Sequence, residues 1–340
     1  MSLAGAITTG DVSQLPSRRD EDWRWTDLRG LLRSLPPAAD PGKSEQPGPF
    51  SEIDADQRIE IVNGRGPEEL ILKGGEILEL RFVATAGGSS VSRLKIYVSG
   101  GGALLLESYE AGAGAVMAID LEFELDACTS IERVVISDCA GDAIVVSRAQ
   151  ANLAWVDASY AQTVLSNGSR RQRIETHVNL TKETRAHLDA AYINDGQRHS
   201  DITTVVTHSG VRGKTDQLTK GVVRDQARGV FQGRIVVERG ADGTEARMGH
   251  HALILSDKAE VDAKPELLIF ADDVQCAHGN TVGALDEAAI FYARQRGMPE
   301  AVARAMLTEA FVGEVVDRIE DEFARDVARA WVSAQLGMGE

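Results

Sequence analysis

Residues 119–126 read IDLEFELD, and this short stretch decides the fold class. Apolar and acidic residues alternate, so an extended chain places its apolar side chains on one face and its carboxylates on the other. Residues 174–180, IETHVNL, repeat the alternation and place His177 on the outward face. Both stretches are therefore predicted to be β-strands with one buried and one solvated face.

The same β-rich character extends from residue 58 to residue 270. Short apolar runs are broken by glycine or polar turns roughly every ten residues. No amphipathic helix of useful length interrupts them, which excludes a doubly wound α/β domain because such a domain needs helical crossovers. A β-sandwich and a β-solenoid both stay open, since the sequence shows no clean repeat period.

The two ends of the chain differ from this body. Residues 35–50 carry five prolines among small polar residues, which predicts a linker. Before it, residues 20–32 contain no proline, and the spacing of their apolar residues predicts one helix. After Gly283 the pattern is helical, with a first helix over residues 285–296 that ends at Gly297.

An apolar stripe follows that first helix. Its members recur at every fourth position: Leu307, Phe311, Val315, Ile319, Phe323, Val327 and Trp331. A spacing of four advances about 40° beyond a full turn at each step, so the stripe winds around a straight helix. Either two helices meet near residues 316–320, or one helix buries different faces against different neighbours. The stripe is suited to capping the β-body or to docking a partner.

Composition narrows the classes of partner. The formal net charge of −16 repels phosphate backbones and anionic lipid, which argues against nucleic acid and membrane surfaces. Residues 1–14 lack a basic start followed by an apolar run, and no apolar stretch reaches bilayer length, so a cytoplasmic protein is expected. The three cysteines, Cys128, Cys139 and Cys276, contain no CxxC pair and argue against a disulfide framework or a four-cysteine metal site.

Motifs for nucleotide binding are incomplete. Residues 210–215, GVRGKT, resemble a phosphate-binding loop, but the first glycine of that motif would fall on His208. We expect a surface turn there and no nucleotide bound by this chain. Most histidines fit ordinary positions: His177, His187, His199 and His208 are expected on exposed strands or turns. His250 and His251 would point to opposite faces of a strand, so the two could not bind one metal ion from a single edge.

Residues 271–283, ADDVQCAHGNTVG, hold the one pair of metal-ligating side chains that stands out. Cys276 and His278 are two positions apart, so in an extended segment both project to the same side. A thiolate and an imidazole are competent metal ligands, although two ligands do not complete a tetrahedral site. Spacing alone favours a buried structural cysteine beside a hydrogen-bonded histidine.

A family resemblance favours a metal-binding role for Cys276 and His278 over a purely structural one. It rests on residues 256–267 (SDKAEVDAKPEL), 271–279 (ADDVQCAHG), 281–283 (TVG), 285–286 (LD), 292–297 (YARQRG), 21–28 (EDWRWTDL), 220–222 (KGV) and 227–233 (ARGVFQG). Together these stretches resemble the SufB/SufD family of iron–sulfur cluster assembly proteins. The order Cys-x-His-Gly resembles the SufD branch, because SufB typically carries an acidic His-Glu segment there. Departures occur at Ala263, Ala277 and residues 249–250, and in a shorter β-body.

The resemblance implies a mainly β fold, a right-handed parallel β-helix flanked by helical segments. The implied division is an N-terminal helical segment (1–35), a proline-rich linker (36–57), the β-helix (58–283) and a C-terminal helical domain (284–340). It also implies a scaffold without catalytic activity that pairs with a SufB-like paralogue and binds a SufC-like ABC ATPase. A homodimer of the isolated chain and a flavin in the complex are further expectations from the family.

Site residues follow from the same resemblance. His278, with Cys276 beside it, would lie at the SufB interface and contribute to a nascent iron–sulfur cluster shared with SufB. The SufC-binding candidates are Leu307, Phe311, Val315 and Ile319. Two alternatives stay open: a β-helix enzyme acting on polysaccharides, which the acidic charge opposes, and a purely structural partner of SufB without metal ligands.

Overall fold

The computed structural model describes residues 2–44 and 46–337 and is dominated by two parallel β-sheets. The nine-stranded odd sheet consists, in spatial order, of β1 (Gln57–Val62), β3 (Ile77–Ala84), β5 (Gly102–Ala111), β7 (Ser130–Ser137), β9 (Ser159–Ser166), β11 (Arg185–Asn194), β13 (Lys214–Val223), β15 (Thr244–Ile254) and β17 (Val274–Gly283). The eight-stranded even sheet consists of β16 (Glu260–Ile269), β14 (Arg228–Val237), β12 (His199–His208), β10 (Arg171–Leu180), β8 (Ile144–Leu153), β6 (Val116–Leu125), β4 (Ser89–Ser99) and β2 (Glu69–Lys73).

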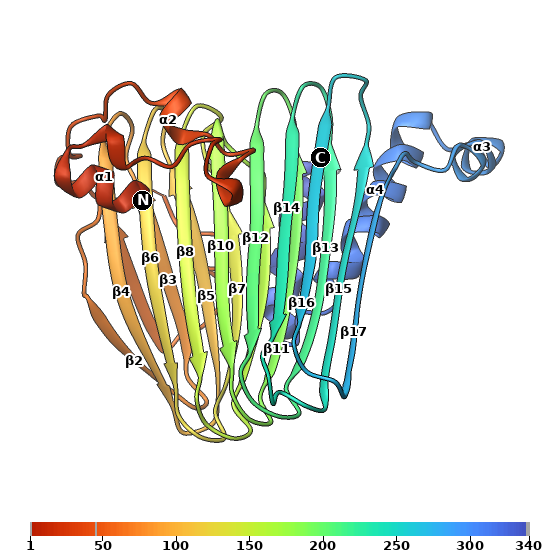
Figure 1. Ribbon diagram of the computed structural model, residues 1–340. Coiled ribbons are helices and arrows are strands. Elements are labelled where there is room, and N and C mark those ends of the chain that lie inside the picture. The colour runs from red at the N-terminus through yellow and green to blue at the C-terminus, as the bar shows by residue number, and fades with distance from the viewer. Residues whose placement is uncertain (1, 45, 338–340) are drawn as a thin grey trace.

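The chain alternates between these two sheets and so winds a parallel β-solenoid of about eight turns (Figure 1). Each strand pairs with the strand two places along the chain. The step between paired residues varies from 21, between Gln57 and Leu78, to 32, between Arg228 and Glu260. This variation explains why no repeat period is visible in the sequence. The solenoid confirms the expected β-helix and removes the sandwich alternative.

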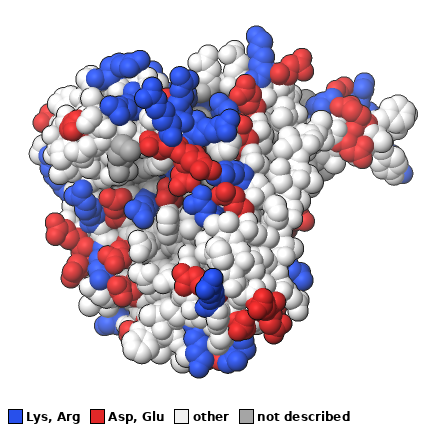
Figure 2. Space-filling model, in the orientation of Figure 1, with Lys and Arg blue, Asp and Glu red and all other residues white. Residues whose placement is uncertain are grey.

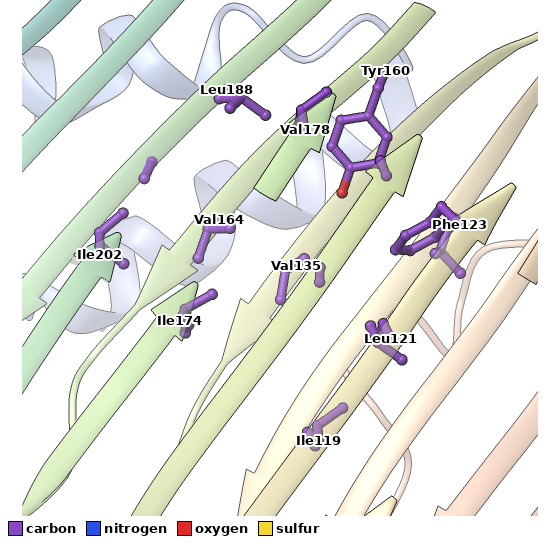
Figure 3. Packing of buried hydrophobic residues seen from close by; sticks show 14 of the residues in the cluster. Ile119, Leu121, Phe123, Val135, Tyr160, Val164, Ile174, Val178, Leu188 and Ile202 are labelled. Atoms are coloured by element: carbon purple, nitrogen blue, oxygen red, sulfur yellow. The ribbon is translucent and has the colours of Figure 1, made fainter. Parts of the chain in front are cut away.

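The solenoid interior is filled by the inward side chains of both sheets. In β6, Ile119, Leu121 and Phe123 are buried while the intervening acids are wholly or partly exposed, as the alternation predicts. Figure 3 shows these residues near inward side chains of the odd sheet, such as Val135 and Tyr160. Stacking of one strand on the next at about 4.8 Å keeps the apolar interior continuous along the axis.

Residues 209–213 form the turn from β12 into β13, which confirms a turn at the predicted place, and Lys214 and Thr215 already belong to β13. Gly210 is required there, because a Cβ atom would clash with the carbonyl oxygen of Thr181 on the neighbouring turn of the solenoid. Arg212 adopts a positive φ of 56° in the same turn. The turn contains no helix N-terminus that could bind a phosphate.

The N-terminal segment lies on the outer face of the even sheet (Figure 1). It contains α1 (Leu3–Thr9), η1 (Val12–Gln14), η2 (Glu21–Trp23) and α2 (Leu28–Leu31). The single helix predicted over residues 20–32 is wrong. Thr26 breaks it, because its buried hydroxyl donates to the Asp201 carboxylate over 2.5 Å, and Asp27 then caps α2 by accepting from the Gly30 amide.

The C-terminal helices are α3 (Glu287–Gln295), α4 (Glu300–Val316) and α5 (Glu322–Gln335). Two helices therefore share the apolar stripe, and the two-helix alternative is confirmed. Asp321 caps α5 by accepting from the Ala324 amide. Buried residues of α4 and α5 pack on the outer face of the odd sheet, whereas α3 projects from the body (Figure 1). Within residues 2–44 and 46–337, no helix is long and apolar enough to span a membrane.

Candidate functional site

The solenoid ends at β16 and β17, which are the terminal strands of their sheets on this side. Each pairs with one neighbour only, β16 with β14 and β17 with β15. Interior-facing Val261 and Leu267 of β16 are half-buried, and Val282 of β17 is 45% exposed. No further turn covers them within the described chain, so the solenoid interior opens to solvent at this end, which we call the open end.

Cys276 and His278 lie together at the open end. Cys276 pairs in register with Ala246 and His278 with Met248, and both of these β15 residues face the solenoid interior. Because parallel strands in register keep their side chains on matching faces, Cys276 and His278 share the face of β17 that continues the interior. Cys276 is half-buried against the core, and His278 is exposed.

The two side chains differ in how ready they are to bind a metal. Burial raises the pKa of the Cys276 thiol, and a backbone hydrogen bond from Ala246 opposes that rise only in part. The thiol must therefore lose a proton when it binds a metal ion, which makes its affinity depend on pH. His278 is the more accessible donor of the pair.

His250 supports the open end from the layer beneath. Its Nδ1 lies 2.7 Å from the Oδ1 of Asn280 on β17, and its Nε2 lies 3.0 Å from the Tyr192 hydroxyl. The ring stacks on Phe231 at 4.8 Å between centroids. Burial lowers the pKa of His250 to about 4, so the ring is neutral and donates from Nδ1 to Asn280. His250 thus holds β17 two residues beyond His278.

The expectation that His250 and His251 face opposite sides is confirmed. His251 is on the outside of β15, where its Nδ1 lies 2.7 Å from the Thr281 hydroxyl. Sequence reasoning assigned both histidines to structure and missed the contact between His250 and Asn280. The available signal was the spacing of two between Met248 and His250, because residues two apart on a strand share a face and Met248 faces the solenoid interior.

Two other histidine predictions are wrong. His199 and His208 were expected to be exposed, but His199 is 2% and His208 0% exposed. His199 starts β12 on the outer face of the even sheet and is covered by the N-terminal segment, where its Nε2 lies 3.1 Å from the Trp25 carbonyl oxygen. His208 faces inward and its Nε2 lies 2.9 Å from the Thr215 hydroxyl. His187 is exposed as expected.

Metal ligands in the chain do not form a complete set. Among the described residues, no group of three or more His, Cys, Asp or Glu side chains is placed to hold a metal ion. Cys139 is buried, where desolvation raises the pKa of its thiol to about 11, and Cys128 is exposed in a turn with a positive φ of 55°. Cys276 and His278 would need ligands from a second molecule to hold a cluster.

The four predicted ATPase-binding residues divide into two kinds. Val315 and Ile319 are fully buried against the odd sheet. Leu307 and Phe311 are half-buried, and the Lys220 ammonium lies 4.4 Å from the centroid of the Phe311 ring. Exposed large apolar residues of the C-terminal helices are Phe291 and Tyr292 on α3, Val302 and Met306 on the first half of α4, and Phe323 on α5.

Comparison with known proteins agrees with the fold and the motifs. The family model described as "SUF system FeS cluster assembly, SufBD core domain" matches residues 82–311. An iron–sulfur cluster assembly SufBD family protein of Synechocystis is 38% identical over 136 residues, 40% of this chain and 30% of the relative. The iron–sulfur cluster assembly protein SufD of Escherichia coli is 38% identical over 139 residues, 41% of this chain and 33% of the relative.

The matched parts of these two relatives amount to about a third of their lengths. A SufBD family protein of Mycobacterium bovis aligns more widely, with 24% identity over 366 residues, 97% of this chain and 91% of the relative. The family match covers most of the solenoid and extends into α4. The chain therefore belongs to the SufB/SufD family of iron–sulfur cluster assembly proteins.

Proposed function

We propose that this chain is a cytoplasmic, SufD-type scaffold subunit that pairs with a SufB-like paralogue through the open end and carries a SufC-like ATPase on α3 and α4. The observation that supports it most is the position of Cys276 and His278 at the open end, where a second solenoid could add the missing cluster ligands. The nascent cluster is the cargo of this interface.

The open end has the character of an interface. At the end of β16, Ile269 and Phe270 are 42% and 59% exposed, and near the far end of β17 Val282 is 45% exposed. Large apolar side chains exposed along one end of a solenoid are typical of an interaction surface. β16 and β17 also present unpaired backbone edges, and such edges favour pairing with another chain. A SufB-like solenoid docked there would cover apolar surface and edges together.

Exposed residues on α3 and α4 support an ATPase dock. Phe291 and Tyr292 are 61% and 60% exposed on a helix that projects from the body, and Met306 is 45% exposed on α4 (Figure 1). Ion pairs hold the two helices to each other, with Arg304 Nη2 3.1 Å from Glu287 Oε1. Exposed aromatic and methionine side chains are typical of interface centres. We place the SufC-binding surface there, next to Leu307 and Phe311.

The role of His278 can be separated from complex formation. We expect His278→Ala to abolish or strongly reduce cluster assembly in a complex that still forms, because the exposed imidazole contributes little to the fold and is the accessible ligand. The measurement is iron and sulfide content of the co-purified complex after reconstitution. His187→Ala, which removes an exposed histidine elsewhere on the odd sheet, is the matched control.

A normal cluster yield from His278→Ala would contradict a ligand role and leave only the structural role of this chain beside SufB. Cys276→Ser in the same assay reports on the second donor. Loss of the complex itself would assign His278 to the protein contact instead of the cluster.

A further inference from the structure

A recess of about 300 Å³ lies on the outer face of the even sheet, across the first residues of β10, β12, β14 and β16. The charged or ionisable side chains that line it are Arg171, Arg198, His199, Arg228, Lys258 and Glu260. Four of these six are cations, on a chain whose formal net charge is −16. In Figure 2, arginine and lysine side chains gather over the N-terminal segment and the adjoining strand ends.

Strand register builds this recess. Gln172 of β10 pairs with Ser200 of β12, so the preceding residues, Arg171 and His199, lie side by side. His199 pairs in turn with Arg228 of β14. Neighbouring strands are about 4.8 Å apart, so two arginines flank one histidine within about 10 Å on a rigid sheet.

Arg171 lacks the counter-ion that a half-buried guanidinium normally has. Its one hydrogen bond within the described chain goes from Nη1 to the Arg170 carbonyl oxygen at 2.7 Å, and its Nε is buried without a partner. Burial, reinforced by the positive charges of Arg228 and Arg170, lowers the pKa of Arg171, and Asp27 compensates only weakly. An anion in the recess would relieve this repulsion.

His199 adds a second unpartnered nitrogen. The residue is 2% exposed, and its Nε2 donates to the Trp25 carbonyl oxygen at 3.1 Å. The proton on Nε2 leaves Nδ1 of the neutral ring with a lone pair, and Nδ1 is buried with no hydrogen-bond partner in the described chain. A ligand group that satisfies it must carry a hydrogen that it can donate.

Arg228, Glu260 and Arg198 at the recess already have partners. Arg228 Nη2 lies 2.6 Å from Asp262 and its Nη1 lies 3.6 Å from Glu260, so the carboxylate at the rim is partly neutralised. Arg198 Nη1 donates to the carbonyl oxygens of Cys139 and Gly168. The Lys258 ammonium makes no hydrogen bond or ion pair with the described residues. The unsatisfied groups are therefore the Arg171 guanidinium, the Lys258 ammonium and the His199 Nδ1 acceptor.

We propose that this recess binds a protonated phosphate group, with the Arg171 guanidinium donating to its oxygens and His199 Nδ1 accepting its hydroxyl proton. Phosphate retains a hydroxyl near neutral pH and sulfate does not, so the site prefers phosphate to sulfate. The volume accommodates a phosphate or pyrophosphate group and not a whole nucleotide. The group comes either from inorganic phosphate or from the terminal phosphate of a nucleotide.

Isothermal titration of the full chain with inorganic phosphate, sulfate and ADP tests this. We expect phosphate to bind, sulfate to bind about tenfold more weakly or not at all, and Arg171→Gln to lose about tenfold in phosphate affinity. Arg185→Gln, which removes an exposed arginine from the odd sheet, is the matched control and should bind as the wild type does. Thermal melts of both variants verify that the fold is retained.

The source of the phosphate is read from the same titrations. Tighter binding of ADP than of inorganic phosphate, lost in Arg171→Gln, identifies a nucleotide phosphate; equal or weaker binding of ADP identifies inorganic phosphate. The proposal is overturned if the wild type binds neither phosphate nor ADP at millimolar concentration, if it binds sulfate as well as phosphate, or if Arg185→Gln loses as much affinity as Arg171→Gln.

Discussion

At the scale of single residues, Arg133 shows how a charged side chain is stabilised inside the solenoid. The Arg133 guanidinium is fully buried, with its Nε 2.7 Å from Glu107 Oε2 and its Nη2 2.8 Å from the Tyr109 hydroxyl. Gln162 and Tyr160 accept from its remaining nitrogen. Every strong donor of this arginine has a partner, as a buried charge requires.

His208 makes the fold sensitive to acid. Burial lowers the pKa of His208 to about 4, whereas an unfolded histidine titrates near pH 6.5. The unfolded chain therefore takes up the proton first, so the free energy of unfolding is at its full value above about pH 6.5 and falls as the pH drops toward 4. The contribution of His208 to this loss is about 2 kcal/mol at pH 5.

Urea denaturation at pH 7 and pH 5 measures this effect. We expect the loss of stability between the two pH values to be smaller by about 2 kcal/mol in His208→Gln than in the wild type. His187→Gln, at an exposed position, should keep the wild-type loss. An unchanged pH dependence in His208→Gln would refute the assignment.

The histidines also show how far local sequence predicts a residue's surroundings. Alternation places His177 on the correct face and His250 opposite to His251, because parity along a strand is a local property. Burial of His199 depends on Trp25, which is 174 residues away and packs over it. Burial of His208 depends on which sheet face turns inward at that strand. The burial of His199 and His208 therefore cannot be predicted from the residues beside them in the sequence.

At the scale of elements, the sequence predicts a strand most clearly where one of its faces is exposed to solvent. The clearest alternating runs, in β6 and β10, both belong to the even sheet. Strands of the odd sheet, such as β5 and β7, are buried on both faces because the C-terminal helices cover the outside. Their apolar residues are nearly continuous, so the alternation disappears. The boundary between α4 and α5 was predictable only as one of two alternatives, since the choice depends on packing against the odd sheet.

Substitutions of two valines on α4 test separately whether the helix packs on the odd sheet and whether it binds the ATPase. Val315 is fully buried and Val302 is 43% exposed. We expect Val315→Asp to destabilise the protein by about 3 kcal/mol or more, because it buries a carboxylate without a partner. We expect Val302→Asp to leave stability within about 0.5 kcal/mol of the wild type and to weaken binding of the SufC-like ATPase by about tenfold.

Urea denaturation and affinity titration with the ATPase subunit give both numbers. The dock on α3 and α4 would be disproved by a Val302→Asp variant that binds the ATPase normally. A Val315→Asp variant with wild-type stability would contradict the packing of α4 on the odd sheet.

At the scale of the whole molecule, solenoid and sandwich could not be separated by period, because the turns differ in length. The family motifs decided the question, and the structure agrees with them. Cys276 and His278 were found from their spacing of two, a local feature. That they lie at the open end, with β17 as a terminal strand, follows only from counting turns in the folded chain.

Association through the open end can be tested with the isolated chain. We propose that two copies pair there when no SufB-like partner is present, and we expect Val282→Lys to raise the dissociation constant of this dimer by about tenfold or more, because it places a charge in an apolar contact. Val156→Lys is the matched control, since Val156 is 41% exposed against 45% for Val282 and lies in a distant turn.

Sedimentation at several protein concentrations supplies the dissociation constants. A wild-type chain that is monomeric at tens of micromolar, or a Val156→Lys variant that dissociates as readily as Val282→Lys, would contradict pairing at the open end.

The open end also has a consequence for the lifetime of the protein. Each turn of a solenoid is stabilised by its neighbours, so a turn held from one side only has the lowest local free energy of opening. The backbone amides of β16 and β17 should exchange hydrogen faster than those of strands in the middle of the solenoid, such as β10 and β11, and fraying there would expose extended chain to proteases. If a partner covers the open end as proposed, a copy without it is degraded first, and the abundance of this subunit follows the supply of that partner.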